Sequence, residues 1–432
     1  MDEERHIPIH VPVLARVEGE GALDLSVRDG RLEHVRLRIF EPPRYFEKLL
    51  EGRHYSEVPD IVARICGICP VAYQMSAVHA LESIFGTEPG PWVREMRRLL
   101  YCGEWLESHS LHIHLLAAPD FLGYPNAVAM AREYRDELRR GLQLQALGND
   151  IIRLLGGRSV HPVGTCVGGF YRAPAAAEVS KLRSRLHDAL PLAEELVQWA
   201  ASLALPHSSQ DFTCVAVRHA DEYPLNEGGI SGSDGLSLPV AAYEDLFQES
   251  HAAHSTALYS RYRNRPYLVG PLARLNLNLD RLPPPVRRNL ERSGVPFPSR
   301  NMFHSIVARA VEMHFAVLEA LRVMDDYRLP DAARVEVAPR AGVGYGCTEA
   351  PRGMLWQRWE TNDQGEILSC RIVPPTSQNQ ARMEDDLRHW VEALGVDTPE
   401  DTLRQRCETV LRNYDPCISC ATHFLRLKVH RG

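Results

Sequence analysis

The chain has 432 residues, 44% of them hydrophobic, which is enough for a sizeable core in one or a few packed units. Its net charge of −7 gives no reason to expect nucleic-acid binding. There is no apolar run of about 18 residues, which excludes a transmembrane helix, and the first residues lack the apolar core of a signal peptide. We therefore expect a cytoplasmic protein.

The first third of the chain predicts a short sheet followed by helices. Apolar and polar side chains alternate over residues 8–40, which is typical of strands. An apolar stripe at helical spacing then covers residues 71–84 and ends at Gly86. A longer helical pattern over residues 92–116 is expected to end before Pro119.

The rest of the chain alternates helices with a loop-rich middle region. A helix is predicted over residues 127–155, and Pro174 opens another that Pro191 should kink or divide. The further predicted elements are a strand at 212–217, a glycine-rich surface turn at 228–235, a helix over 301–328, a strand at 334–338, a hairpin around 362–365 and two C-terminal helices. This order predicts one mainly α domain with small peripheral β-sheets, an α+β fold.

Two Cys-x-x-Cys pairs lie near opposite ends of the chain, Cys66 with Cys69 and Cys417 with Cys420. Two thiolates three residues apart can bind one metal ion, because a tight turn brings both sulfurs to the same side. If the pairs meet, four thiolates form a site suited to nickel, iron or zinc. The other six cysteines stand alone and are expected to be buried, so no ligand set remains for an iron–sulfur cluster of this chain's own.

Two other uses of the cysteine pairs fit the sequence less well. Structural zinc sites usually have their pairs within about 20 residues of each other, whereas nearly the whole chain separates these two. Charged residues such as Arg64 and Asp415 flank the pairs, which a reactive metal needs more than a structural one does. A thioredoxin-like dithiol would need only one pair, after a strand–helix unit that neither pair has. The pattern favours a reactive metal centre.

The residues around the pairs, RICGICP at 64–70 and DPCISCATH at 415–423, resemble the two nickel-binding signatures of the large subunit of nickel–iron hydrogenases. Further matches to that family follow in chain order: RVEG at 16–19, RYFE at 44–47, the segment from His109 to Asp120, GRSVHP at 157–162, EAPRG at 349–353 and VPPT at 373–376. The resemblance spans residues 16–423. Residues 41–53 look most like the cytoplasmic, NAD(P)-linked sulfhydrogenase group.

The resemblance implies the metals and their ligands. All four cysteines, Cys66, Cys69, Cys417 and Cys420, would bind nickel, and Cys69 and Cys420 would also bridge to iron. The iron would carry carbon monoxide and cyanide ligands made by maturation enzymes. Fold and activity would follow the family: a hydrogenase large-subunit fold that interconverts H2 with protons and electrons.

The resemblance also implies the residues around the metals. Cys417 would accept the first proton and pass it to Glu18, since a carboxylate within hydrogen-bond reach of a thiol can act as a shuttle. Arg352 would lie over the metals, with Asp415 and Asp120 as its partners. His109, His112 and His114 are expected to be core histidines rather than ligands.

Glu47 and His423 would hold a separate magnesium-type ion at the C-terminal end of the domain. A maturation endopeptidase would remove residues 424–432, so that the mature domain covers residues 1–423. The chain departs from the family where Tyr73 stands in place of a histidine that members often have, and tyrosine can donate one hydrogen bond to a thiolate without carrying positive charge. Glu20 likewise stands where many members have histidine.

Electrons would leave through an iron–sulfur small subunit, and a flavin- and NAD(P)-binding module would complete a heterotetramer. Two alternatives stay open at this point. One is a non-catalytic, hydrogenase-derived scaffold subunit of a respiratory complex, although such scaffolds have lost the cysteines that this chain retains. The other is a zinc-stapled structural protein, which metal analysis would separate from a hydrogenase.

Overall fold

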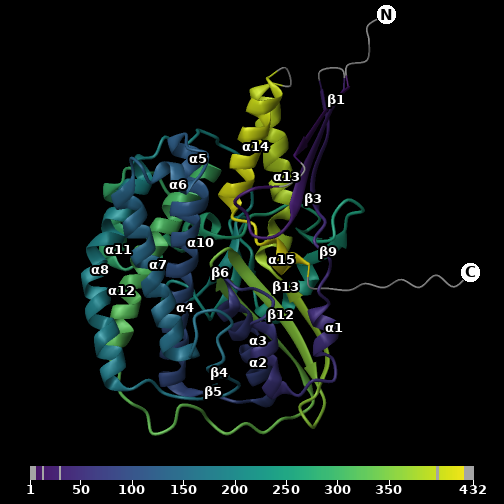
Figure 1. The fold of residues 1–432 in the computed structure, drawn as a ribbon. Coiled ribbons are helices and arrows are strands. Elements are labelled where there is room, and N and C mark those ends of the chain that lie inside the picture. Colours follow the sequence, from purple (N-terminus) through teal and green to yellow (C-terminus); the bar gives the residue numbers. More distant parts are fainter. Residues whose placement is uncertain (1–5, 12–13, 29–30, 396–397, 423–432) are drawn as a thin grey trace, which may run out of the picture.

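The computed structural model describes residues 6–11, 14–28, 31–395 and 398–422. Long helices form a bundle on one side of the molecule, and short sheets with two upright helices form the other side (Figure 1). The long helices of the bundle are α4 (Gly90–Leu111), α7 (Arg135–Gly156), α8 (Ala176–Ser202) and α12 (Ser305–Asp325). Helix α4 lies between α7 and α12. Among the described helices, none has the length and apolar character that a membrane span requires.

The remaining helices are mostly short. They are α1 (Phe46–Leu50), α2 (Val58–Val62), α3 (Pro70–Phe85), α5 (Ala118–Leu122), α6 (Ala127–Met130), α9 (Tyr243–Leu246), α10 (Pro271–Asn278), α11 (Pro284–Arg292), α13 (Pro375–Leu394), α14 (Glu400–Tyr414) and α15 (Ile418–Ala421). A π-helical turn, η2 (His112–Ala117), joins α4 to α5. Single 3-10 turns are η1 (Tyr55–Glu57), η3 (Val240–Ala242), η4 (Leu279–Arg281) and η5 (Met302–His304).

The described strands form small antiparallel sheets. The N-terminal sheet has the order β1 (His6–Val11), β2 (Gly21–Arg28) and β3 (Arg31–Ile39), and its buried face packs on α13. A second sheet consists of β11 (Gly342–Ala350), β12 (Gly353–Thr361) and β13 (Ile367–Val373). The smaller ones are β4 (Thr165–Cys166) with β5 (Gly169–Phe170), β6 (Val215–Arg218) with β7 (Gly229–Gly232) and β8 (Ser237–Leu238), and β9 (Phe247–His251) with β10 (Leu258–Tyr262).

Glycines let strand β11 lie directly on helix α3. A Cβ atom added at Gly346 would come within 1.9 Å of the Ser76 carbonyl oxygen, and one added at Gly344 within 2.2 Å of the Ala80 carbonyl oxygen. Only glycine permits this approach between strand and helix. The contact fixes the β11–β12 hairpin against α3, the helix that begins directly after Cys69.

We predict that Gly346→Ala destabilises the protein by at least about 2 kcal/mol, because the added methyl group meets rigid helix backbone rather than a side chain that can rotate away. Urea denaturation of the purified protein would measure this change. Gly229→Ala is the matched control, since a Cβ at that strand position would lie an ordinary 3.4 Å from its nearest neighbour. Equal denaturation midpoints for the two variants would contradict the prediction.

Several predictions from the sequence are confirmed. The N-terminal sheet forms, α3 ends at Gly86 in the left-handed conformation, and the hairpin at 362–365 joins β12 to β13. The two C-terminal helices are α13 and α14. The mainly helical fold class with small sheets is also confirmed; in the β11–β13 sheet the central strand β12 is largely buried, and β13 is partly exposed.

Two helix boundaries were predicted wrongly, and the division that was one of the two outcomes expected at Pro191 does not occur. The predicted helix over 127–155 is two helices, α6 and α7, with a break between them. Pro119 does not end the helical path, because the π turn leads into α5 and places the proline in its first turn, where its missing N–H is not needed. Pro191 does not divide α8, which packs along α12 and continues through it.

One strand was predicted wrongly, and several were missed, namely β4, β5 and β7 to β11. Residues 334–338 form no strand, and only Arg334 makes an isolated bridge, to Gly169. Strand β11 was missed because glycine at 342, 344 and 346 is unusual in strands.

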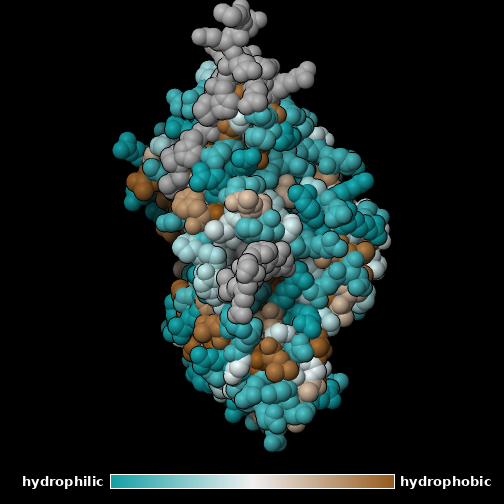
Figure 2. Space-filling view, turned by 90° about the vertical axis from the view of Figure 1, so that its right-hand side faces the viewer, coloured by the Kyte–Doolittle hydropathy of each residue, from teal (hydrophilic) through white to brown (hydrophobic). Residues whose placement is uncertain are grey.

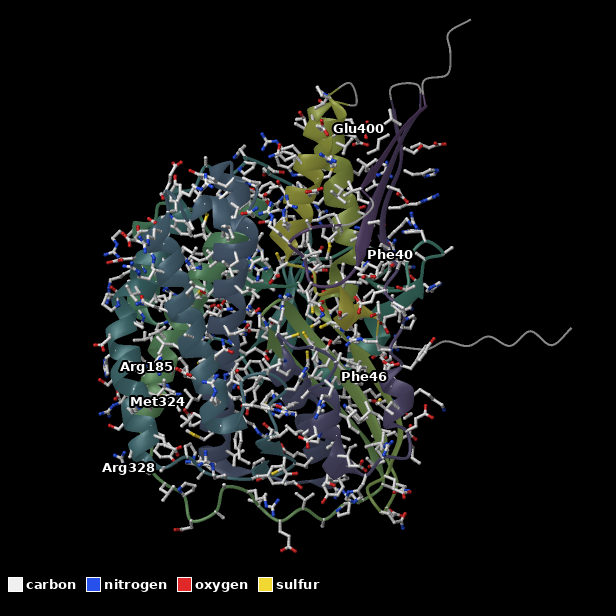
Figure 3. The ribbon with its side chains drawn as sticks, in the orientation of Figure 1. Phe40, Phe46, Arg185, Met324, Arg328 and Glu400 are labelled. Carbon is white, nitrogen blue, oxygen red and sulfur yellow. The ribbon has the colours of Figure 1, made fainter. Side chains whose placement is uncertain are left out.

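Polar side chains cover most of the surface. Nitrogen and oxygen tips line the outer edge of the helical bundle, including Arg185 on α8 (Figure 3), which pairs with Asp150 of α7 at 2.7 Å. On the face that carries α1, apolar residues are scattered among hydrophilic ones (Figure 2).

Candidate metal centre

The two Cys-x-x-Cys pairs meet in the interior of the protein. The sulfur atoms of Cys66, Cys69, Cys417 and Cys420 all lie within 4.8 Å of one another, and all four residues are buried. The Sγ atoms are 3.4 Å apart between Cys66 and Cys417, 3.6 Å between Cys69 and Cys420, and 2.9 Å between Cys417 and Cys420. The predicted convergence of the two ends of the chain is confirmed.

The first pair is held at the start of helix α3. The backbone N–H groups of Ile68 and Cys69 both donate to the Cys66 sulfur, at 3.3 Å each. Glu104 of α4 caps the helix from outside, since its carboxylate accepts the N–H groups of Val71 at 2.6 Å and Ala72 at 3.2 Å. Sequence reasoning missed Glu104, whose only signal is an acidic residue on an apolar helix face.

The second pair is held by the N-terminal segment. The Cys417 N–H donates to the Thr376 hydroxyl at 3.0 Å, and the Ile418 N–H donates to the Glu18 carbonyl at 3.0 Å. Glu18 and Cys417 form a parallel bridge, so the RVEG segment runs beside the second signature. A Cβ added at Gly19 would lie 2.7 Å from Ile418, which explains the need for glycine there.

The Glu18 carboxylate lies within hydrogen-bond reach of a thiol of the centre. Its Oε2 atom is 3.1 Å from the Cys417 sulfur and accepts the Ser419 N–H at 3.1 Å. Glu18 is half-buried, whereas the cysteines are fully buried. The carboxylate is therefore placed between the sulfur and the solvent side.

Arg352 lies at the tip of the β11–β12 hairpin and faces the cysteines. Its guanidinium donates to the Asp415 carbonyl at 2.8 Å, to the Asp415 carboxylate at 3.0 Å and to the Ser108 hydroxyl at 3.4 Å. Burial alone would lower the pKa of Arg352, but Asp415 and the nearby cysteine sulfurs raise it well above its usual value. The side chain keeps its positive charge beside the four sulfurs.

Asp415 is the partner expected for Arg352, but Asp120 is not. Asp120 forms ion pairs with Arg16 and with Arg412, the latter at 2.7 Å. Arg16 is two residues from Glu18 and Arg412 is three residues from Asp415, so Asp120 ties the N-terminal segment to α14. The predicted pairing of Asp120 with Arg352 is wrong, because these two arginines reach its carboxylate instead.

The histidines of α4 and η2 are core residues, as expected. His109 contacts Glu312 at 2.9 Å, and His112 contacts the Arg412 carbonyl at 2.8 Å. Burial lowers the pKa of His109 to about 4 and that of His112 to about 3. In the described part of the chain, no histidine joins the four cysteines.

Tyr73 is buried next to the centre. Burial raises its pKa well above the usual value, and the sulfurs of Cys420, Cys69 and Cys66 raise it further. The hydroxyl stays neutral, as the substitution for histidine predicts. It can donate toward a sulfur without adding positive charge.

Arg44 of the RYFE segment connects the two cysteine signatures, and Glu47 of the same segment contacts strand β13. Arg44 donates to the carbonyls of Ile65 and Ser419, one next to each cysteine pair. The Glu47 carboxylate accepts the Ile372 N–H at 2.8 Å. His423, its expected partner in a magnesium site, lies outside the described residues, as does the 424–432 extension.

The residues present fit a soft-metal centre. Four buried thiols at one point would repel one another as thiolates, and a bound metal ion of borderline softness removes that repulsion. The positive Arg352 and the backbone donors to Cys66 also favour negative charge here. The donor set suits nickel and iron as well as zinc.

Comparison with known proteins decides between these metals. The model of the family described as nickel-dependent hydrogenase matches residues 44–141 and 240–423. Sulfhydrogenase 1 subunit alpha of Pyrococcus furiosus is 34% identical over 426 residues, which cover 98% of this chain and 99% of that protein. The chain belongs to the nickel-dependent hydrogenase family.

Other relatives agree along the whole chain. Sulfhydrogenase 2 subunit alpha of Pyrococcus furiosus is 32% identical and covers 97% of this chain and 100% of that protein. A crystal structure of an NAD+-reducing [NiFe]-hydrogenase in the H2-reduced state superposes with a TM-score of 0.87 at 28% identity, and covers 98% of this chain and 100% of that chain. This protein is therefore the catalytic large subunit of a nickel–iron hydrogenase, an oxidoreductase that acts on H2. The scaffold and zinc-staple alternatives are set aside.

Proposed function

We propose that the four cysteines hold a nickel–iron centre at which H2 is cleaved heterolytically, and that Glu18 carries the proton away. Cys66, Cys69, Cys417 and Cys420 would hold nickel, and Cys69 and Cys420 would also hold the iron, which would carry carbon monoxide and cyanide. When bound, the metals supply an open coordination position that polarises H2 and accepts its electrons. The observation that carries this proposal is the group of four sulfurs with a carboxylate 3.1 Å from one of them.

The chain's own residues supply the proton route. The Cys417 sulfur is the first acceptor, and the Glu18 carboxylate is the next, because its Oε2 atom lies 3.1 Å from that sulfur. The Ser419 N–H holds the same Glu18 oxygen in place. Glu41 would be the next carboxylate toward the solvent, since its Oε2 accepts the N–H of Glu20, two residues after Glu18, at 3.3 Å.

Arg352 supplies fixed positive charge. Its two hydrogen bonds to Asp415 fix the plane of the guanidinium, and no water has to reorganise when charge develops beside it. Its role is to stabilise the separation of a proton from the electrons that stay on the metals.

Electrons leave where the first signature reaches the surface. Gly67 is exposed although Cys66 and Cys69 on either side are buried, and Val160 packs nearby with 51% of its surface exposed. An iron–sulfur small subunit docks here, because the described residues contain no second cluster of ligands to relay electrons.

The partners beyond the small subunit are a flavin- and NAD(P)-binding module, in a cytoplasmic heterotetramer. The similarity to sulfhydrogenase alpha subunits and to an NAD+-reducing hydrogenase supports this assignment. Glu47 and His423 would hold a magnesium-type ion beside the first signature.

Isotope exchange tests the proposed reaction. The purified complex, incubated with H2 in D2O, should form HD without any added electron acceptor, since heterolytic cleavage releases a proton to solvent. Nickel should be present at one equivalent per catalytic subunit, with iron in excess of nickel, because the small subunit contributes iron–sulfur clusters of its own. Absence of HD from a fully metal-loaded complex would overturn the proposal.

We predict that the active protein ends at His423. A maturation endopeptidase would remove residues 424–432 once nickel is bound, so intact-mass measurement of the active complex should find a chain shorter by those nine residues. An active enzyme that retains the whole extension would contradict this prediction.

A further inference from the structure

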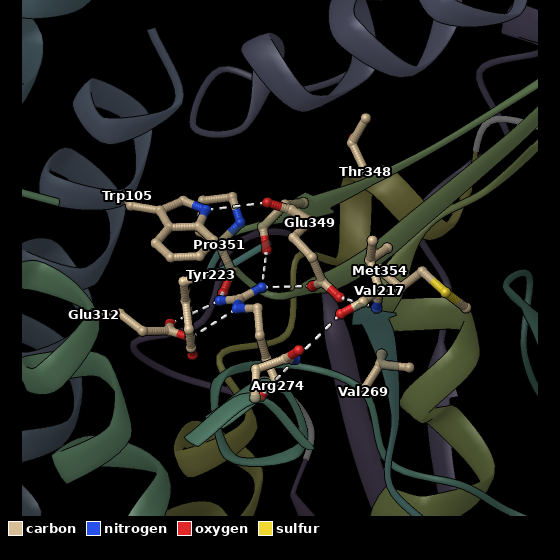
Figure 4. Close-up of polar contacts among 12 residues, drawn as sticks. Trp105, Val217, Tyr223, Val269, Arg274, Glu312, Thr348, Glu349, Pro351 and Met354 are labelled. Carbon is tan, nitrogen blue, oxygen red and sulfur yellow. Dashed lines mark hydrogen bonds and ion pairs between the residues drawn. The ribbon is translucent and has the colours of Figure 1, made fainter. Parts of the chain in front are cut away.

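Arg274 is the centre of a fully buried network next to the Arg352 hairpin (Figure 4). Its Nε and Nη2 atoms donate to the two oxygens of Glu312 at 2.7 Å each, and its Nη1 donates to Glu349 at 2.6 Å. The guanidinium lies 4.1 Å from the centre of the Trp105 ring, and Trp105 donates to the Glu349 carbonyl at 3.0 Å.

The same guanidinium holds the backbone of the turn that carries Arg352. Residues 351 and 352 form a two-residue turn, because Ala350 pairs with Gly353 across the hairpin. Arg274 donates to the Ala350 carbonyl at 2.9 Å and to the Pro351 carbonyl at 3.3 Å. These are the two carbonyls directly before Arg352, at the point where the ladder of strand hydrogen bonds ends.

The other side of the turn is equally constrained. Gly353 has a φ of +135°, and a Cβ there would lie 2.7 Å from Val269 and 2.8 Å from the Gly270 nitrogen. A Cβ at Gly270 would lie 3.0 Å from the Arg352 carbonyl. The turn is thus held between Val269 and Gly270, which directly precede α10, on one side and the guanidinium of Arg274, a residue of α10, on the other.

The network is anchored from the helical bundle. Glu312 of α12 also accepts the Tyr223 hydroxyl at 2.8 Å and contacts His109. Burial would raise the pKa of Glu312, but Arg274 and His109 lower it to about 2, so the carboxylate is ionised. The ionised Glu312 carboxylate therefore holds the Arg274 guanidinium in place beside the turn.

We propose that Arg274 is a positioning residue for the hydrogenase reaction: by holding the Ala350 and Pro351 carbonyls, it sets the Arg352 guanidinium against Asp415 beside the metal centre. This inference rests on the proposed role of Arg352. The ionised Glu312 carboxylate already balances the charge of Arg274, so the contribution of Arg274 is geometric. A guanidinium can reach two carbonyls and two carboxylates at once, and a lysine ammonium cannot.

Four variants test the inference in the purified complex: Arg274→Lys, Arg274→Met, Arg352→Lys and the double variant Arg274→Met/Arg352→Lys. With nickel and iron content unchanged, each Arg274 variant should lower kcat for H2 uptake about 100-fold, as expected for a misplaced catalytic group. The double variant should be no slower than Arg352→Lys, because Arg274 acts only through Arg352. The crystal structure of Arg274→Lys should show the hydrogen bonds from Arg352 to Asp415 broken or lengthened.

Arg98→Met is the matched control, because Arg98 is also buried and paired with two glutamates, Glu222 and Glu319. It should lower the melting temperature as Arg274→Met does and leave kcat unchanged. Wild-type kcat in Arg274→Lys, multiplied effects in the double variant, or an unmoved Arg352 in the crystal would each overturn the inference. Full activity of Arg352→Lys would overturn the role of Arg352 itself. Fully active Arg274 variants together with an inactive Arg352→Lys would instead overturn only the inference about Arg274.

Discussion

Cys417→Ser should abolish H2 uptake while leaving the chain folded. The Cys417 sulfur is the one that lies within 3.4 Å of Cys66, 2.9 Å of Cys420 and 3.1 Å of Glu18. Serine replaces a soft thiolate with an alcohol that stays protonated at neutral pH, so both a metal ligand and the first proton acceptor are lost. H2-dependent dye reduction and nickel content should both fall to background, and removal of the 424–432 extension should stop.

Cys407→Ser is the control for that variant, because Cys407 is equally buried but lies on α14 outside the sulfur group. It should keep nickel and activity. Nickel binding and H2 uptake at wild-type levels in Cys417→Ser would show that this sulfur does not hold the metal.

Glu18→Gln should leave the metals in place and stop proton transfer. Glutamine has the shape of glutamate and can still accept the Ser419 N–H, but it cannot carry a proton. Loss of a positioned acid–base group typically costs 10²–10⁴-fold in rate, and we expect a fall in HD formation in that range. Nickel and iron content measured on the same samples should equal those of the wild type.

An exposed carboxylate far from the sulfurs serves as the comparison. Glu392→Gln on α13 changes the net charge in the same way and should not alter HD formation. If Glu18→Gln forms HD as fast as the wild type does, the proton leaves by another route.

The cysteine centre could be predicted from the sequence, because each pair is a local motif at a helix start. Cys69 is followed by Pro70 and a helical stripe, and the structure has it as the N-cap of α3. The family resemblance supplied Glu18 and Arg352, which the structure places at the sulfurs.

The residues that brace the centre could not be predicted. Arg274, Glu312 and Glu349 come from α10, α12 and β11, and no local pattern tells which buried charges will meet. For Asp120, the sequence offers Arg16, Arg352 and Arg412 as equally good partners, and only the fold shows which of them reach it. The glycines of β11 were misleading for the same reason. They allow the strand to lie directly on helix α3, which is more than 250 residues away in the sequence.

The sulfur environment of nickel is the most direct test of the central claim. X-ray absorption at the nickel edge of the purified complex, together with metal analysis, should find one nickel per catalytic subunit and nickel bound mainly by sulfur. Zinc in place of nickel, or nickel bound mainly by nitrogen and oxygen, would contradict a centre built from these four cysteines.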